Sequence, residues 1–278
     1  MIRVSQARRF RERYGPWAVV AGASAGLGAE YARQLAALGL NILLIARRQT
    51  ELDALASELT ARYHVETRAL AFDLGADDAP ARVETACADL DIGLLVYNAA
   101  RSVIGPFLDR PLEEHLNEIA VNVRAPMSLA WRLGRRLRAR GRGGVILMSS
   151  LSAAQGSALI ANYGATKAYN QLLAEGLWEE LRASGVDVLA CVAGAIATPN
   201  FAASGARSQG AADATTLTPE AVARETLSAL GSGPLAAPGA GVKAAAFVMR
   251  RLLPRAFAIR TMGSVMRRMY SGEPEAEA

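Results

Sequence analysis

Short apolar runs and helical segments alternate along most of this chain, and that alternation restricts the fold more than any other feature. The runs have no polar side to turn toward solvent, so each strand must be covered on both faces. Helical segments of ten or more residues separate them, as in parallel β–α–β units. Strands are expected at residues 17–21, 41–46, 66–72, 93–97, 144–148, 186–192 and 235–239. The sequence therefore predicts an α/β fold, a doubly wound parallel sheet of about seven strands with helices on both faces.

The series continues without a linker or a change of composition. We therefore expect residues 1–278 to form a single Rossmann-type domain. A basic arm at residues 1–15 precedes the first strand, and amphipathic helices at about 241–270 follow the last one. Apolar residues make up 51% of the chain, which is enough for a large core.

A glycine-rich turn joins the first expected strand to the first expected helix. Its sequence is Gly22-Ala-Ser-Ala-Gly26-Leu-Gly28. Glycines permit a tight turn and let a pyrophosphate approach the N-terminus of the helix. The spacing differs from the common GxGxxG pattern, and a purely structural turn is the alternative. Its position in the β–α–β series favours a dinucleotide site, with candidate contacts at Gly22, Ser24, Ala25, Gly26, Leu27 and Gly28.

The end of the second expected strand bears on the choice of cofactor. Proteins that bind NAD usually carry a carboxylate there, which binds the 2′-hydroxyl of the ribose. This chain has Ala46 followed by Arg47 and Arg48, so two cations are available for a 2′-phosphate. The alternative is two solvated arginines that open a helix. The sequence favours NADP(H) over NAD(H).

A serine, a tyrosine and a lysine follow the fifth expected strand. Tyr163 lies thirteen positions after Ser150, and Lys167 lies four positions after Tyr163. In the helix expected over residues 162–184, positions i and i+4 share one face. A neighbouring ammonium favours the phenolate and lowers the pKa of a tyrosine toward working pH. A serine hydroxyl could hold a reacting oxygen against the phenol, so the pattern predicts a proton-transfer site.

Taken together, these motifs resemble the short-chain dehydrogenase/reductase family, over about residues 15–240. The tyrosine and lysine alone arise by chance in many chains of this length. The ordered set is specific: the glycine turn, Asp73-Leu74, Asn98-Ala99-Ala100, Asn122, Ser150, Tyr163, Lys167 and Gly194 to Thr198. The resemblance implies hydride transfer between a nicotinamide and a carbonyl or carbinol carbon of a small molecule.

The resemblance also implies a role for each matching residue. Tyr163 would be the general acid/base, Lys167 would lower its pKa and bind the nicotinamide ribose, and Ser150 would orient the reacting oxygen. Asn122 would hold a water that connects Lys167 to solvent; a helix kink before Pro126 is the alternative reading.

The remaining matching residues would contact the cofactor. Asp73, with Leu74, would contact the adenine, and a strand-end cap is the alternative for Asp73. Asn98 would brace the sheet beside the cofactor, and Ala99 and Ala100 would be further cofactor contacts. Gly194, Ile196 and Thr198 would hold the carboxamide.

Three loops after the expected strands are candidates for substrate contact, at residues 101–107, 151–162 and 198–217. The middle loop is small and apolar, and the last reads as a mobile lid that carries Phe201. These loops favour a lipophilic substrate, as in the hydroxysteroid dehydrogenase-like and 3-ketoacyl reductase-like members of the family. The resemblance also leads us to expect a homodimer or a homotetramer.

The C-terminal segment reads as two basic amphipathic helices that meet at Pro254. One hypothesis is attachment to an anionic membrane surface, so that peripheral membrane contact stays open. The other is that these helices cover the substrate pocket or a dimer interface.

Composition narrows the remaining possibilities. The net charge is +5, but arginines gather at both ends and no nucleic-acid motif accompanies them. The two cysteines, Cys87 and Cys191, have no metal-ligand spacing, so no metal is expected.

His64 and His115 are expected at the surface. The N-terminus lacks an apolar signal core, so we expect a cytoplasmic protein. An NADP(H) sensor without turnover and non-redox chemistry of the epimerase or dehalogenase kind are the competing hypotheses.

Overall fold

The computed structural model describes residues 4–203, 205 and 216–271. Within this part of the chain, one sheet contains the strands β1 (Trp17–Ala21), β2 (Asn41–Ala46), β3 (Thr67–Ala71), β4 (Ile92–Tyr97), β5 (Gly143–Ser150), β6 (Val186–Ala193) and β7 (Leu235–Ala236). The α-helices are α1 (Val4–Tyr14), α2 (Gly26–Ala37), α3 (Gln49–Tyr63), α4 (Ala79–Ala86), α5 (Leu112–Ile119), α6 (Ala125–Arg140), α7 (Ala161–Arg182), α8 (Pro199–Ala203), α9 (Pro219–Ala229), α10 (Ala240–Phe247) and α11 (Arg255–Ser271). Short 3-10 segments, η1 (Phe107–Asp109) and η3 (Leu151–Ala154), and π segments, η2 (Ala120–Arg124) and η5 (Val248–Leu252), complete the described elements.

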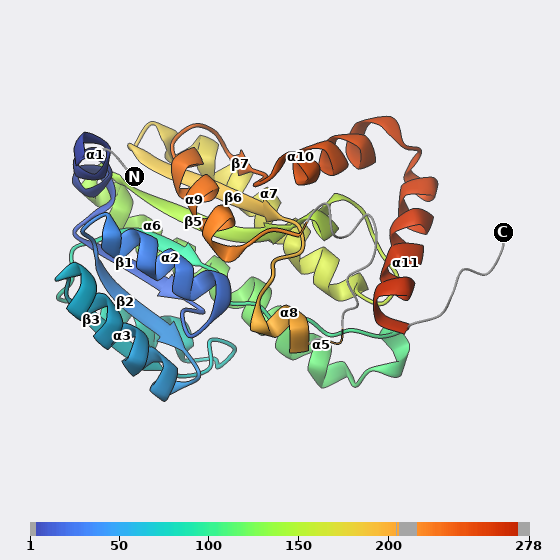
Figure 1. Ribbon diagram of the computed structural model, residues 1–278, viewed down its shortest axis with the longest axis horizontal. Helices are drawn as coiled ribbons and strands as arrows, with labels where there is room; N and C mark the ends of the chain where they lie inside the picture. The colour runs from blue at the N-terminus through green and yellow to red at the C-terminus, as the bar shows by residue number, and fades with distance from the viewer. Residues whose placement is uncertain (1–3, 204, 206–215, 272–278) are drawn as a thin grey trace.

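The sheet is parallel throughout and has the strand order β3-β2-β1-β4-β5-β6-β7. Helices α2, α3 and α9 pack on one face, and α4, α6 and α7 pack on the other (Figure 1). Two apolar clusters, one on each face, cover the strands. The predicted doubly wound α/β fold is confirmed, and the direction of winding reverses between β1 and β4. Ligands of such sheets bind at this reversal point, beyond the carboxyl ends of the strands.

The helix expected over residues 112–140 is divided by a π turn. Helix α5 ends at Ile119, the π segment η2 follows, and α6 begins at Ala125. Pro126 lies in the first turn of α6, where its missing N–H costs least. Single π turns inside helices often mark functional sites, and this one holds Asn122.

The glycine turn after β1 is required by close packing. Gly22 has a positive φ of 85°, a conformation that favours glycine. A Cβ at position 28 would lie 1.8 Å from the carbonyl oxygen of Gly22. The side chain of Asn98, at the end of β4, donates to the same carbonyl oxygen at 3.1 Å. The turn is therefore held against β4, the strand across the reversal point.

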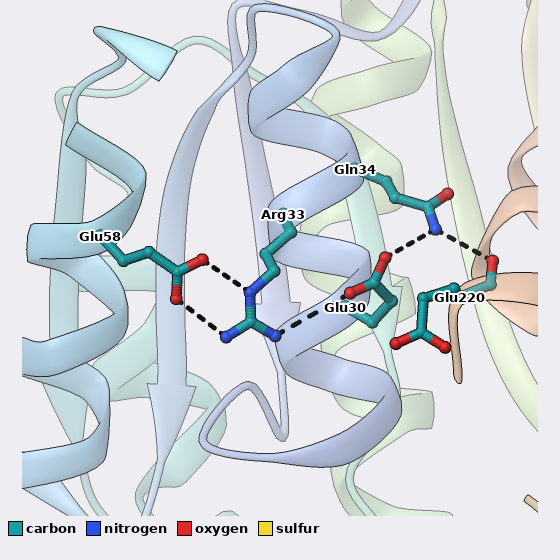
Figure 2. A network of polar contacts seen from close by, with 5 residues as sticks. All are labelled: Glu30, Arg33, Gln34, Glu58 and Glu220. Atoms are coloured by element: carbon teal, nitrogen blue, oxygen red, sulfur yellow. Dashed lines mark hydrogen bonds and ion pairs between the residues drawn. The ribbon is translucent and has the colours of Figure 1, made fainter. Parts of the chain in front are cut away.

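A polar network outside the sheet joins α2 to α3 and α9 (Figure 2). Arg33 donates from Nε and Nη2 to the two carboxylate oxygens of Glu58, at 2.8 Å each, and pairs with Glu30 at 3.9 Å. Gln34 donates to Glu30 at 2.8 Å and to the carbonyl oxygen of Glu220 at 3.0 Å. The two parallel hydrogen bonds between Arg33 and Glu58 have favourable geometry, but both side chains are partly exposed. Such a pair therefore contributes about 1 kcal/mol or less to the free energy of unfolding. The network fixes the helix that begins at the glycine turn.

The C-terminal helices extend beyond the carboxyl edge of the sheet (Figure 1). They break at Pro254, as expected, and α11 packs against the 151–160 segment. Arg255 donates to the carbonyl oxygen of Ala154 at 2.7 Å, and a Cβ at Gly263 would lie 3.5 Å from that of Ala158. Helix α11 therefore lies against one of the three loops expected to contact the substrate.

Two further expectations concern the last loop and the membrane. Residues 204 and 206–215 of the lid expected at 198–217 lie outside the described residues. Among the helices described, none has the length and hydropathy that a membrane span requires.

Candidate active site

The catalytic candidates meet at the carboxyl end of β5. Ser150 is the last residue of that strand and caps η3, where its Oγ accepts from the backbone N–H of Ser152 at 3.2 Å. Helix α7 begins at Ala161 and packs along β5 and β6, so its first turns lie beside that strand end. Tyr163 and Lys167 lie one turn apart, with the Lys167 ammonium 5.5 Å from the centre of the Tyr163 ring.

Burial controls the ionisation of Lys167. The residue is only 2% exposed, and its Nζ donates to the carbonyl oxygen of Met148 on β5 at 3.1 Å. Desolvation of the ammonium lowers the pKa of Lys167 to about 8, although the charge of Glu118 opposes the change. The lysine is therefore still mostly charged at neutral pH.

The pKa of Tyr163 changes in the direction opposite to the one expected from its neighbour. Burial raises the pKa of Tyr163 to about 12, and hydrogen bonding to the Ser150 side chain only partly opposes this. Electrostatic interactions with Glu118 and with the titrating phenol of Tyr270 raise the pKa further. The Lys167 ammonium, which donates to Met148, does not bring the pKa below its ordinary value in this arrangement. Tyr163 is thus a neutral phenol at pH 7, in the form that donates a proton.

Asn122 connects the loop after β4 to the catalytic helix. It is fully buried within the π segment. Its side chain accepts from the backbone N–H of Arg101 at 2.9 Å and donates to the Arg101 carbonyl oxygen at 2.8 Å. It also donates to the Thr166 hydroxyl at 3.1 Å, one residue before Lys167. Asn122 thus lies in the π turn before Pro126, as the kink reading expects, and its role in holding a water near Lys167 stays a prediction.

The cofactor candidates gather on the β1 side of the same edge. Helix α2 begins without a side-chain cap, which leaves the N–H groups of its first turn available to an anion. Arg47 and Arg48 are exposed at the end of β2. Arg48 donates to the Ser24 hydroxyl of the glycine turn at 3.1 Å and pairs with Glu51 at 3.0 Å. Arg48 therefore borders the glycine turn, and Arg47 directly precedes Arg48 in the sequence.

The segments after β3, β4 and β6 approach the glycine turn to different extents. Asp73 accepts from the backbone N–H of Gly75 at 2.8 Å, which is the strand-end cap considered for it. The backbone N–H groups of Asn98 and Ala99 donate to the Ala21 carbonyl oxygen at 2.9 and 2.8 Å. A Cβ at Gly26 would lie 2.9 Å from Cγ2 of Thr198. Thr198 therefore lies against the glycine turn, and the assignment of Gly194, Ile196 and Thr198 to the cofactor stays a prediction. Leu74 is buried and Ala100 is exposed.

Two residues of α5 differ from what the sequence suggested. His115 is only 6% exposed, so the expectation of a surface histidine is wrong; His64 is exposed. The His115 ring stacks on Phe107, with 4.3 Å between ring centres. Glu118 is fully buried and was not singled out from the sequence. The available signal was its spacing, three residues after His115 and four before Asn122, which puts all three on one face of the helix.

Comparison with known proteins bears on this geometry. A sequence profile described as short chain dehydrogenase matches residues 16–209. A 7beta-hydroxysteroid dehydrogenase of Collinsella aerofaciens is 33% identical over 192 residues, which are 69% of this chain and 73% of that protein.

Solved structures agree with this match. One, from work on 7beta-hydroxysteroid dehydrogenase stereoselectivity, superposes with a TM-score of 0.86 at 30% identity, covering 91% of this chain and 99% of the other. A short-chain dehydrogenase from Sphingobium yanoikuyae in complex with NADPH has a TM-score of 0.75 at 26% identity, with 95% and 98% covered.

The buried ammonium predicts a pH-dependent stability difference. The unfolded chain holds the Lys167 proton up to about pH 10.4, whereas the folded protein holds it only to about pH 8. Between these values the unfolded state binds more protons, so wild-type stability gains from this group as pH rises. Lys167→Met should therefore raise the free energy of unfolding below pH 8, on the order of 2 kcal/mol, and the advantage should vanish toward pH 10.5. Urea unfolding of both proteins between pH 6 and 10.5 measures this, and a pH-independent difference would contradict it.

Proposed function

The chain belongs to the short-chain dehydrogenase family, and from that premise we propose that it is an NADP(H)-dependent oxidoreductase that interconverts a ketone or aldehyde with an alcohol. The observation that supports this proposal most strongly is that Ser150, Tyr163 and Lys167 lie together at the carboxyl end of β5. The glycine turn lies at the same edge of the sheet. Enzymes of this family act on small molecules.

The residues at the glycine turn fit a dinucleotide phosphate. The first turn of α2 offers uncapped N–H groups, Arg48 offers positive charge beside it, and Arg47 adds a second charge at the end of β2. The protein from Sphingobium yanoikuyae, solved with NADPH, supports the choice of NADP(H). When bound, this cofactor would supply or accept the hydride.

Side chains of the protein supply the proton and stabilise the groups that exchange it. In the reducing direction, the neutral Tyr163 phenol donates its proton to the substrate oxygen, and Ser150 donates a hydrogen bond to the same oxygen. The Lys167 ammonium favours the phenolate left behind, because an adjacent positive charge stabilises the anion. Asn122 holds the loop at Arg101 and the turn at Thr166 in fixed relation to that pair.

A lipophilic substrate agrees with the surroundings of Tyr163. The 151–160 segment contributes small and apolar side chains, including Ala153, Ala158 and Ile160. Helix α11 packs over this segment through Arg255 and Gly263. This packing supports covering of the substrate side by the C-terminal helices, in preference to membrane attachment. The similarity to a 7beta-hydroxysteroid dehydrogenase points to the same substrate class.

Self-association is supported by an apolar surface on α5, α6 and α7. Trp131 and Leu172 are 58% and 66% exposed. Exposed apolar side chains gathered on neighbouring helices mark interaction sites. The occupant we propose is a second copy of the chain, giving a homodimer or a homotetramer. The other exposed members of this surface are Leu112, Leu116, Ile119, Met127 and Tyr169.

Replacement of the phenol tests the catalytic assignment. Tyr163→Phe should lower kcat about a hundredfold or more, because general acid–base catalysis contributes on that scale. NADPH binding, followed by fluorescence, should be unchanged. Tyr169→Phe, which alters an exposed tyrosine of the same helix, should keep wild-type turnover. Retained turnover in Tyr163→Phe would reject the role, and a sensor would show no turnover even in the wild type.

Charge reversal beside the glycine turn tests the cofactor assignment. Arg47→Asp should raise the KM for NADPH about tenfold or more, because a charge-assisted contact to the 2′-phosphate is lost. The KM for NADH should change little. Arg62→Asp, on the exposed far end of α3, is the control and should alter neither value. Equal effects of Arg47→Asp on the two cofactors would contradict the assignment.

A charge introduced on the apolar surface tests self-association. Trp131→Glu should convert the oligomer to a monomer, since a buried carboxylate without a partner is costly. Leu252→Glu, at an exposed apolar residue outside this surface, should leave the mass unchanged. Light scattering after size exclusion gives the mass of each variant. A monomeric wild type, or an unchanged mass in Trp131→Glu, would count against the surface.

A further inference from the structure

Glu118 is a fully buried carboxylate that the proposed mechanism does not use. It lies near the C-terminal end of α5, four residues before Asn122. Carboxylates are rarely buried unless their oxygens are hydrogen-bonded. Both oxygens of Glu118 have partners here, and the partners come from two different segments of the site.

The first partner belongs to the loop after β4. Oε1 of Glu118 accepts from the backbone N–H of Val103 at 2.9 Å. His115, one turn earlier on the same face of α5, contacts the backbone oxygen of Phe107 through Nε2 at 3.0 Å and stacks on the Phe107 ring. Two residues of one helix face therefore hold this loop at two points.

The second partner belongs to the catalytic helix. Oε2 of Glu118 accepts from Nδ2 of Asn162 at 2.6 Å, and the same nitrogen donates to the carbonyl oxygen of His115 at 3.2 Å. Asn162 directly precedes Tyr163 in the first turn of α7. The carboxylate thus joins the β4 loop to the turn that carries the proton-donating phenol.

We propose that Glu118 is a positioning residue, which holds the 101–109 loop against the start of α7 and keeps a buried carboxylate hydrogen-bonded to the turn that carries Tyr163. This inference rests on the proposed oxidoreductase function. It assigns no contact between Glu118 and the substrate.

The charged and titratable groups around Glu118 come from several elements. His115 on α5 and Arg101 on the β4 loop both favour the carboxylate, although burial raises the pKa of Glu118. The Glu118 charge raises the pKa of Tyr163 and also that of Lys167 on α7. Tyr270 on α11 acts on Tyr163 in the same direction, and Cys191 on β6 acts likewise on Lys167. Loss of the Glu118 charge should therefore lower both pKa values.

Two substitutions separate the two effects. Glu118→Gln removes the charge and keeps an oxygen that accepts from Val103, but its amide nitrogen replaces the oxygen that accepted from Asn162. Its pH profile of kcat/KM for ketone reduction should move to lower pH, and the 13Cζ resonance of Tyr163 should titrate at lower pH. Glu118→Ala also removes the acceptor, so the Val103 amide should exchange faster with deuterium and kcat/KM should fall about tenfold or more. Glu113→Gln, at an exposed carboxylate of the same helix, is the control and should match the wild type.

A compensating variant guards against simple misfolding. Glu118→Gln with Asn162→Asp returns one negative charge to the pair and should bring the pH profile back toward wild type. An unshifted Tyr163 titration in Glu118→Gln, or an unchanged exchange rate at Val103 in folded Glu118→Ala, would overturn the inference. Absence of ketone reduction by the wild type would instead reject the proposed function, and the Tyr163 titration and the Val103 exchange would still decide the role of Glu118.

Discussion

The parallel sheet is the constraint on which every other feature of the site depends. Because all strands point the same way, the loops that follow β1, β2, β4, β5 and β6 emerge at one edge. The strand order reverses between β1 and β4. The loops that follow β1 and β4 therefore run to opposite sides of this point. The glycine turn is held at that point by Asn98, and Ser150 arrives one strand further along. Residues more than a hundred positions apart in sequence therefore share one site.

The site departs from the rules that stabilise the rest of the core. Lys167 and Glu118 are charged residues that lie buried, together with several buried polar residues such as Asn122 and Thr166. Each is tolerated because its polar atoms have partners: Met148 for the lysine, and Val103 and Asn162 for the glutamate. Burial of charge disfavours the ionised forms, which lowers the pKa of Lys167 and raises that of Tyr163. The burial that makes the Lys167 charge costly for stability therefore also sets the pKa values of the residues proposed to transfer the proton.

The sheet, the glycine turn, the catalytic helix and the break at Pro254 could be predicted from the sequence, because each follows from local patterns of apolar, glycine and proline residues. Ser150, Tyr163 and Lys167 could be grouped because their spacing and their positions after one strand are local too. The burial of His115 and Glu118 could not, since polar residues on a short helix are usually solvated. The upward shift of the Tyr163 pKa could not be predicted from the sequence either, because it depends on burial and on electrostatic interactions with residues of α5 and α11.

The central claim is that this edge of the sheet transfers a hydride from NADPH to a carbonyl carbon while Tyr163 supplies the proton. Reduction of bulky apolar ketones by the wild-type protein with NADPH deuterated at C4 tests it most directly. The account predicts one deuterium at the carbinol carbon of the alcohol for each NADPH consumed, measured by mass spectrometry and NMR. Alcohol formed without cofactor deuterium, or no NADPH consumption across a broad ketone panel, would contradict it.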